Sequence, residues 1–200
     1  MYNRVCKRLI DFVLALIASP FVCIVILIMA PIIYLNDPGP IFFNAKRRGK
    51  DGKVFKMYKL RSMYVNAPDL RNDDGSTFNS SEDSRVTKVG RFMRKTSIDE
   101  LPQVFNVLFG DMSIIGPRPI LATQPYEKLS DLAKKRLKIR PGITGYAQAY
   151  YRNAIGEEEK FKVDCYYGEH ISFILDIKIL VKTFVTVIKK DNIYVSEQKK

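Results

Sequence analysis

One long apolar run dominates the pattern of hydrophobic and polar positions along the chain. The segment 12–35 contains 24 residues without a charge, and about 20 apolar residues are enough to span a bilayer. Asp11 interrupts the approach to this run, and no clear small-x-small cleavage site precedes a mature start, which disfavours a signal peptide. The pattern therefore predicts a membrane helix near the N-terminus.

Basic residues on both flanks favour a membrane hairpin over a crossing. Eight basic residues and one acidic residue occupy 46–61, and three more basic residues precede the run: Arg4, Lys7 and Arg8. The positive-inside tendency keeps both flanks on the cytoplasmic side. Pro20 lacks an N–H and bends helices, and the Ser19 hydroxyl can bond a freed carbonyl. We predict a re-entrant helix-break-helix over 1–36 and a separate domain over 37–200, with a spanning helix as the alternative.

The rest of the pattern predicts an α/β fold that is mostly helical. A β-hairpin with a Gly-containing turn is expected from 41–43 and 54–58. Four helices are expected, over 97–108, over 126–138, from Glu157 onward and over 173–190. Gly110 is expected to end the first of them. The polar segment 66–84 is predicted to be a surface loop and a candidate lid.

The last predicted helix leaves two interpretations open. Its apolar residues recur at helical spacing and would share one face: Ile174, Ile177, Leu180, Val181, Phe184 and Ile188. Such a face either packs into the protein core or lies in the membrane interface.

Composition narrows the classes of partner. The net charge of +12 favours nucleic acid, anionic lipid or phosphorylated substrates, although a cytoplasmic membrane protein carries such an excess anyway. The three cysteines are odd in number and form no CxxC, so we expect free thiols. His170 is the single histidine, so no second histidine is present to form a metal site or catalytic triad with it. A nucleic-acid-binding membrane protein is one rival, but no motif for it occurs. A non-catalytic anchor is the second.

The adjacent carboxylates Asp99 and Glu100 are the strongest candidate for chemistry. Ser97 and Glu100 have the spacing of a capping box, which alone indicates a helix N-terminus. However, basic residues surround the pair: Lys88, Arg91, Arg94 and Lys95 precede it, and Arg118 follows between two prolines. Cations at a helix N-terminus suit phosphate. Carboxylates in such a site suit a bridging Mg²⁺, and an Asp there can also attack phosphorus.

Four motifs follow one another in order behind the Ser-Pro membrane segment. They are Lys-Leu-Arg-Ser-Met at 59–63, Thr-Ser-Ile-Asp-Glu-Leu-Pro-Gln at 96–103, the segment Gly110 to Pro119, and Arg-Pro-Gly-Ile-Thr-Gly at 140–145. Over nearly its whole length the chain resembles the bacterial sugar transferases, and among them the small monotopic phosphoglycosyl transferases.

The resemblance implies a reaction in two steps. Asp99 would attack the β-phosphate of a UDP-sugar, release UMP and carry the phosphosugar covalently. Undecaprenyl phosphate would then attack this intermediate, in the first membrane step of glycan assembly. Asp99 would also contact Mg²⁺, and Glu100 would assist as general base or by positioning.

The resemblance also implies binding residues and a location. The substrate- and phosphate-binding positions would be Lys59, Arg61, Arg94, Arg118, Arg140, Gln148, Arg152 and Asn153. The enzyme would face the cytoplasm from the bacterial inner membrane, with membrane lipid and downstream glycosyltransferases as further partners and no nucleic acid. Tyr150 and Tyr151 replace Asn and Gly of many members, and they either stack on uracil or sugar or belong to the core or membrane surface.

Overall fold

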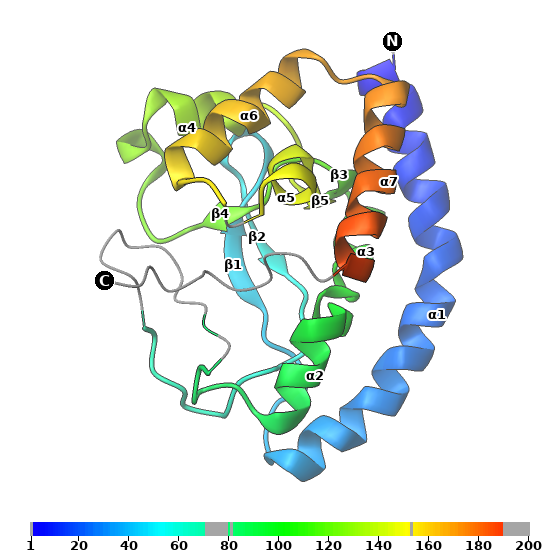
Figure 1. Ribbon diagram of the computed structural model, residues 1–200, viewed down its shortest axis with the longest axis vertical. Coiled ribbons are helices and arrows are strands. Elements are labelled where there is room, and N and C mark those ends of the chain that lie inside the picture. The colour runs from blue at the N-terminus through cyan, green and yellow to red at the C-terminus, as the bar shows by residue number, and fades with distance from the viewer. Residues whose placement is uncertain (1, 71–79, 81, 153, 190–200) are drawn as a thin grey trace.

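Helices form most of this α/β chain, and two small sheets lie between them (Figure 1). The computed structural model describes residues 2–70, 80, 82–152 and 154–189. The α-helices are α1 Lys7–Asn36, α2 Lys88–Thr96, α3 Gln103–Phe109, α4 Asp131–Arg136, α5 Tyr146–Tyr150, α6 Glu157–Glu169 and α7 Phe173–Lys189. A π-helical turn, Tyr2–Cys6, precedes α1, and shorter 3-10 turns are η2 Lys50–Gly52, η3 Ile98–Glu100 and η4 Tyr126–Lys128.

Helix α1 is a single curved helix that follows one side of the molecule from end to end (Figure 1). The break predicted at Ser19 and Pro20 is absent from this helix, because a local bond replaces the missing one. Pro20 cannot donate to the Leu16 carbonyl, and the Ser19 hydroxyl donates to that same oxygen at 2.9 Å. By length and composition α1 could cross a membrane. Its re-entrant topology stays a prediction.

One stripe of α1 packs against the rest of the protein along the whole helix. The buried residues recur at intervals of four and seven: Lys7, Asp11, Ala15, Val22, Met29 and Ile33. Ala15 joins one core cluster with Met57 and Val107, whereas Met29 joins another with Leu60 and Met93. The other faces of α1 carry exposed apolar side chains from Leu9 to Leu35.

The sheets are small and differ in direction. Strands β1 Ala45–Arg48, β2 Val54–Met57 and β4 Ile120–Leu121 form an antiparallel sheet in the order β2-β1-β4. Strands β3 Ser113–Ile115 and β5 Gly142–Thr144 pair in parallel. The predicted hairpin is present, but its first strand is the basic segment itself and not 41–43. Arg48 pairs with Val54 in the register, and Phe42 forms only an isolated bridge with Leu60.

The prediction of one helix starting at Ser97 is wrong. A separate helix, α2, comes first, and the Thr87 side chain caps it by accepting from the Gly90 N–H at 2.8 Å. Ser97 ends α2 in the left-handed conformation, with φ of 58°, and its side chain makes no capping bond. Asp99 and Glu100 therefore lie in the 3-10 turn that connects α2 to α3.

The later helices follow the prediction more closely. Gly110 ends α3 with φ of 91°, and α6 begins at Glu157 as expected. The helix predicted over 126–138 is divided, because Leu129 is extended between η4 and α4. The predicted lid falls partly on 71–79 and 81, which lie outside the described residues.

Helix α7 presents its apolar stripe outward. Four of the six residues in the predicted stripe are exposed: Ile174, Ile177, Val181 and Phe184. Leu180 is half-buried, and the inward face instead buries Asp176 and Ile179. Figure 1 shows α7 beside the N-terminal half of α1. The core interpretation of this stripe is therefore wrong, and the two helices together expose a large apolar surface.

Candidate active site

Asp99 is a buried carboxylate beside a lysine ammonium. Its residue is 1% exposed, and its Oδ2 lies 2.8 Å from Lys59 Nζ. The same ammonium lies 3.2 Å from Oε1 of Glu100. Lys59 comes from the segment after β2, and its neighbour Leu60 donates a backbone N–H to the Asp99 carbonyl at 2.9 Å. The structure thus brings together three of the predicted site residues from distant parts of the sequence.

One oxygen of the Asp99 carboxylate lacks a hydrogen bond from the residues that the structure describes. Within the described part of the chain, its buried Oδ2 accepts no aligned hydrogen bond, although the Lys59 ammonium is close enough to pair with it. A buried polar atom without a hydrogen bond is costly in a folded protein. A catalytic or ligand-binding role is one explanation for such an atom in a native structure.

Glu100 contacts two cations. Arg118 Nη2 is 3.4 Å from Oε1 of Glu100, the same oxygen that the Lys59 ammonium contacts. Burial acts to raise the pKa of the Glu100 carboxyl, but the Lys59 ammonium and the Arg118 guanidinium outweigh it and hold the pKa at about 2. Glu100 is therefore a permanent anion at neutral pH and a weak base.

Buried contacts that the sequence analysis missed fix the position of Arg118. The Arg136 side chain donates to the Arg118 carbonyl at 2.6 Å and also pairs with Asp164 at 2.8 Å. Gly116 is required next to this turn, because a Cβ there would lie 2.2 Å from the Arg140 carbonyl oxygen. The exposed Arg118 side chain thus extends from a backbone that is held rigidly.

Asn106 fixes the position of the segment that carries Lys59. This fully buried amide accepts from the Tyr58 N–H at 2.9 Å and donates to the Lys56 carbonyl at 2.8 Å. It joins α3 to the end of β2. Helical spacing alone gave no signal for it, because Asn106 lies among the apolar positions of α3 without belonging to their pattern.

Two of the predicted phosphate ligands, Arg61 and Arg94, contact other protein groups in this structure. The Arg61 guanidinium pairs with the Asp37 carboxylate and donates to the Pro40 carbonyl at 2.6 Å, which ties the end of α1 to the domain. The Arg94 Nε donates to the Ser62 hydroxyl at 3.0 Å. Neither contact joins these arginines to Asp99, and their proposed role toward substrate stays a prediction.

The predicted residues near the end of the motif series lie around β5 and α5. Gln148 Nε2 donates to the Ile143 carbonyl at 3.3 Å, whereas its buried Oε1 accepts no hydrogen bond from the described residues. Burial, and then the nearby Arg8 charge, lower the pKa of Arg140. Arg152 has a left-handed backbone with φ of 46°, and Asn153 lies outside the described residues.

The tyrosines of this region form an aromatic cluster. Tyr150 stacks on Tyr146 with ring centroids 4.8 Å apart, and Lys182 Nζ lies 5.8 Å above the Tyr150 ring. His170 stacks on Tyr166, which agrees with an ordinary structural role. As predicted, the thiols of Cys6, Cys23 and Cys165 are free.

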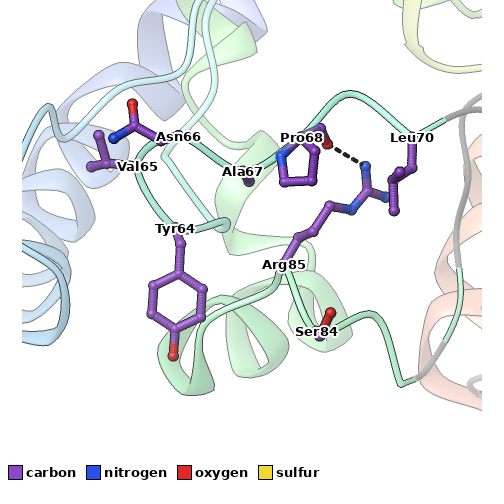
Figure 2. A pocket seen from close by; sticks show the side chains of 8 residues that line it. All are labelled: Tyr64, Val65, Asn66, Ala67, Pro68, Leu70, Ser84 and Arg85. Carbon is purple, nitrogen blue, oxygen red and sulfur yellow. Dashed lines mark hydrogen bonds between the residues drawn. The ribbon is translucent and has the colours of Figure 1, made fainter.

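A separate hollow of about 320 Å³ lies beside Arg85 (Figure 2). The Arg85 side chain pairs with Asp83 at 2.9 and 2.7 Å and donates to the Pro68 carbonyl at 3.0 Å, the bond drawn in Figure 2. Because this guanidinium is committed to protein partners, we interpret the hollow as part of the loop structure and not of the active site.

Asp99 and Glu100 are the candidate ligands for a metal ion in this site. Residues 2–70, 82–152 and 154–189 contain no group of three or more His, Cys, Asp or Glu side chains suited to a metal ion. Mg²⁺ is commonly held by one or two carboxylates together with substrate phosphates. Asp99, with its unsaturated Oδ2, and Glu100 fit that smaller set of ligands.

Comparisons with known proteins agree on one family. The model for the bacterial sugar transferases matches residues 2–190. The chain is 41% identical over 188 residues to an uncharacterized sugar transferase, EpsL, of Bacillus subtilis, covering 94% of this chain and 89% of EpsL. It is 42% identical over 198 residues to UDP-glucose:undecaprenyl-phosphate glucose-1-phosphate transferase of Escherichia coli, covering 94% of this chain. It is also 41% identical over 194 residues to galactosyl transferase CpsE of Streptococcus agalactiae. The chain spans 40% and 43% of the lengths of these last two relatives.

Proposed function

Because this chain belongs to the bacterial sugar transferase family, we propose that it transfers a sugar 1-phosphate from a UDP-sugar to undecaprenyl phosphate. The names of relatives specify this chemistry for them, including the Escherichia coli glucose-1-phosphate transferase. The observation that carries the proposal here is the buried Asp99 carboxylate, paired with Lys59 beside Glu100 and Arg118. This cluster combines a nucleophile with cations suited to phosphate.

The proposed reaction has two displacements at the same phosphorus. An Asp99 oxygen forms a bond to the β-phosphorus, the bond from that phosphorus to the bridging oxygen breaks, and UMP leaves with the oxygen. A phosphate oxygen of undecaprenyl phosphate then bonds to the phosphorus of the aspartyl-phosphosugar. That step releases the Asp99 carboxylate and yields the polyprenyl diphosphate sugar.

We assign Glu100 to positioning rather than to proton transfer. A carboxyl with a pKa of about 2 is a poor general base near neutral pH, and the phosphate acceptor is already an anion. Oε1 of Glu100 instead contacts both Lys59 and Arg118 and holds the two cations near each other. These cations would then face the diphosphate and its developing charge.

A Mg²⁺ ion fits the same site as cofactor, held by Asp99 and Glu100. When bound, it would reduce the repulsion between the two carboxylates and the substrate phosphates. Lys59 and Arg118 would orient the donor through its phosphates. Arg61, Arg94, Arg140, Gln148, Arg152 and Asn153 stay proposed substrate contacts.

The packing of α1 supports a monotopic placement on the cytoplasmic face of the inner membrane. A helix that packs against one body from Lys7 to Ile33 cannot cross a bilayer unless that body crosses with it. The exposed apolar faces of α1 and α7 would enter the lipid, with the basic domain facing anionic headgroups. Downstream glycosyltransferases would meet the product on that same face.

This placement predicts that both ends of the membrane segment are cytoplasmic. In a background without Cys6, Cys23 and Cys165, single cysteines at Asn3 and Asn66 should both react with an impermeant reagent only after the cytoplasmic side is opened. The reason is the shared body on which both ends of α1 pack. Labelling of the Asn3 position from the periplasmic side would contradict the re-entrant topology.

The proposed activity is tested by UMP release across a panel of UDP-sugars. We expect one donor to give UMP and a lipid-linked product with undecaprenyl phosphate. Without acceptor, the enzyme should release no more than one UMP per molecule and retain labelled sugar phosphate on the protein. Absence of UMP release with every donor would contradict the proposed function, and strong salt-dependent nucleic-acid binding instead would favour the rival class.

A further inference from the structure

An apolar groove lies next to the active site, between the membrane helix and α3. It has a volume of about 230 Å³. Ile26 of α1 lies on one side, Pro102, Phe105 and Phe109 of the α3 region lie on another, and Phe42, Asn44 and Tyr58 complete the lining. We infer that this groove binds the first isoprene units of the lipid acceptor, and this inference rests on the proposed function.

The position of the groove matches an acceptor whose head must reach Asp99. Tyr58 directly precedes Lys59, the residue paired with Asp99, and Pro102 lies two positions after Glu100. The far side of the groove is Ile26, on a helix whose outer faces are exposed and apolar. A chain lying here would therefore run from the carboxylates toward lipid.

The chemistry of the lining fits a hydrocarbon chain. Five of the seven lining residues are apolar, and the other two are Asn44 and Tyr58. Pockets that enclose drug-sized ligands hold about 300–1,000 Å³, so this smaller groove suits a slender branched chain. The Phe109 ring is edge-on to the Tyr58 ring, with the ring centroids 6.4 Å apart. Phe109 is 70% exposed, and a bound prenyl chain would remove part of this apolar surface from water.

The groove is also built rigidly. Asn106 joins α3 to the Tyr58 backbone, and Arg8 donates to the Val107 and Leu108 carbonyls at 2.6 and 3.0 Å, which fixes the end of α3 against α1. A preformed groove costs little ordering on binding. The groove can therefore discriminate among acceptors by their prenyl chains, independently of how strongly each acceptor binds to the membrane.

Two substitutions test the groove with little risk to folding, because both side chains are partly exposed. We expect Phe42→Ala and Phe109→Ala each to lower kcat/KM for geranylgeranyl and undecaprenyl phosphate about tenfold, the loss from removing one aromatic contact. The value for dimethylallyl phosphate should stay within about twofold, because its single unit is too short to fill the groove. The penalty should not grow from the geranylgeranyl to the undecaprenyl acceptor.

Phe43→Ala is the matched control. Phe43 neighbours Phe42 and is 59% exposed, but it does not line the groove. We expect it to weaken membrane binding without changing the preference for chain length. An equal penalty in Phe43→Ala, or no penalty in either groove variant, would overturn the inference.

The donor half-reaction separates this inference from the proposed function. UMP release without acceptor should be the same in the wild type, Phe42→Ala and Phe109→Ala. If the wild type itself released no UMP from any donor, the proposed function would fail. If UMP release were intact while every acceptor reacted equally well with all variants, the groove alone would fail.

Discussion

Replacing Asp99 by Asn is expected to lower UMP release by about 10⁴-fold or more, the loss seen when a nucleophile is removed from a cluster that acts as a unit. An amide keeps the shape of the side chain but cannot form the aspartyl-phosphosugar. Covalent retention of labelled sugar phosphate should disappear together with turnover. Both are measured in single-turnover reactions with the preferred UDP-sugar.

The same variant should fold and bind membranes normally. Within the described residues, Asp99 Oδ2 accepts no hydrogen bond, and Lys59 keeps Glu100 as a partner, so little stabilisation is lost with the charge. Thermal denaturation should show a Tm near that of the wild type or slightly above it, as for residues kept for function at a cost in stability.

Asp131→Asn provides a matched control, since it makes the same chemical change at an exposed residue in the first turn of α4. It should leave UMP release unchanged. Full turnover in Asp99→Asn, with the loss appearing in Glu100→Gln instead, would exchange the roles of the two carboxylates. Normal turnover in both would support the non-catalytic anchor.

The motifs predicted a site that includes Lys59, Asp99, Glu100 and Arg118, and the structure brings these residues together. The local geometry predicted around Ser97 was wrong. Ser97 and Glu100 have capping-box spacing, yet Ser97 ends one helix in a left-handed conformation and caps none. Spacing of three residues fits either arrangement. In the folded protein this turn also makes a long-range contact, the bond from the Leu60 N–H to the Asp99 carbonyl. A local pattern contains no information about that pairing.

The orientation of α7 shows a second limit of the same kind. Periodicity predicted the helix and its apolar stripe, and left open whether that stripe faces the core or the membrane. The inward face contains Asp176, a residue that pattern analysis assigns to solvent. It can be buried because Tyr2 and Lys7 near the N-terminus and Tyr167 of α6 supply its partners, and no periodicity within α7 indicates them.

Those partners make Asp176 the residue whose loss should destabilise the protein most. Its Oδ2 accepts from Lys7 Nζ at 2.6 Å and from the Tyr2 hydroxyl at 2.7 Å. Its Oδ1 accepts from the Tyr167 hydroxyl at 2.7 Å. Lys7 and Asp176 are both buried, and together they fasten the start of α1 to α7 (Figure 1).

Asp176→Ala is therefore expected to lower the free energy of unfolding by about 3–5 kcal/mol, because it leaves the Lys7 ammonium buried without its counter-ion. For a chain of this size the corresponding fall in Tm is about 10 °C. The measurement is thermal denaturation in detergent micelles. As a comparison, Glu158→Ala removes an exposed partner of Lys162 and should cause no measurable change.

A double variant distinguishes the loss of a charge pair from a loss of packing. Lys7→Met combined with Asp176→Leu replaces both charges by apolar groups of similar size. It should recover the part of the stability lost in Asp176→Ala that comes from the unpaired Lys7 ammonium, but not the part that comes from the Tyr2 and Tyr167 hydroxyls, which still lack their acceptor. Activity should fall together with stability, because the start of α1 also positions β3. One turn after Lys7, the Asp11 carboxylate accepts from the Ser113 hydroxyl at 2.7 Å and from the Ile114 N–H at 3.0 Å. Strand β3 leads directly to Gly116 and Arg118. If Asp176→Ala melted like the wild type, the Lys7–Asp176 pair would contribute nothing to the attachment of α1, and the contacts of Arg8 and Asp11 together with the apolar stripe would be sufficient to hold it.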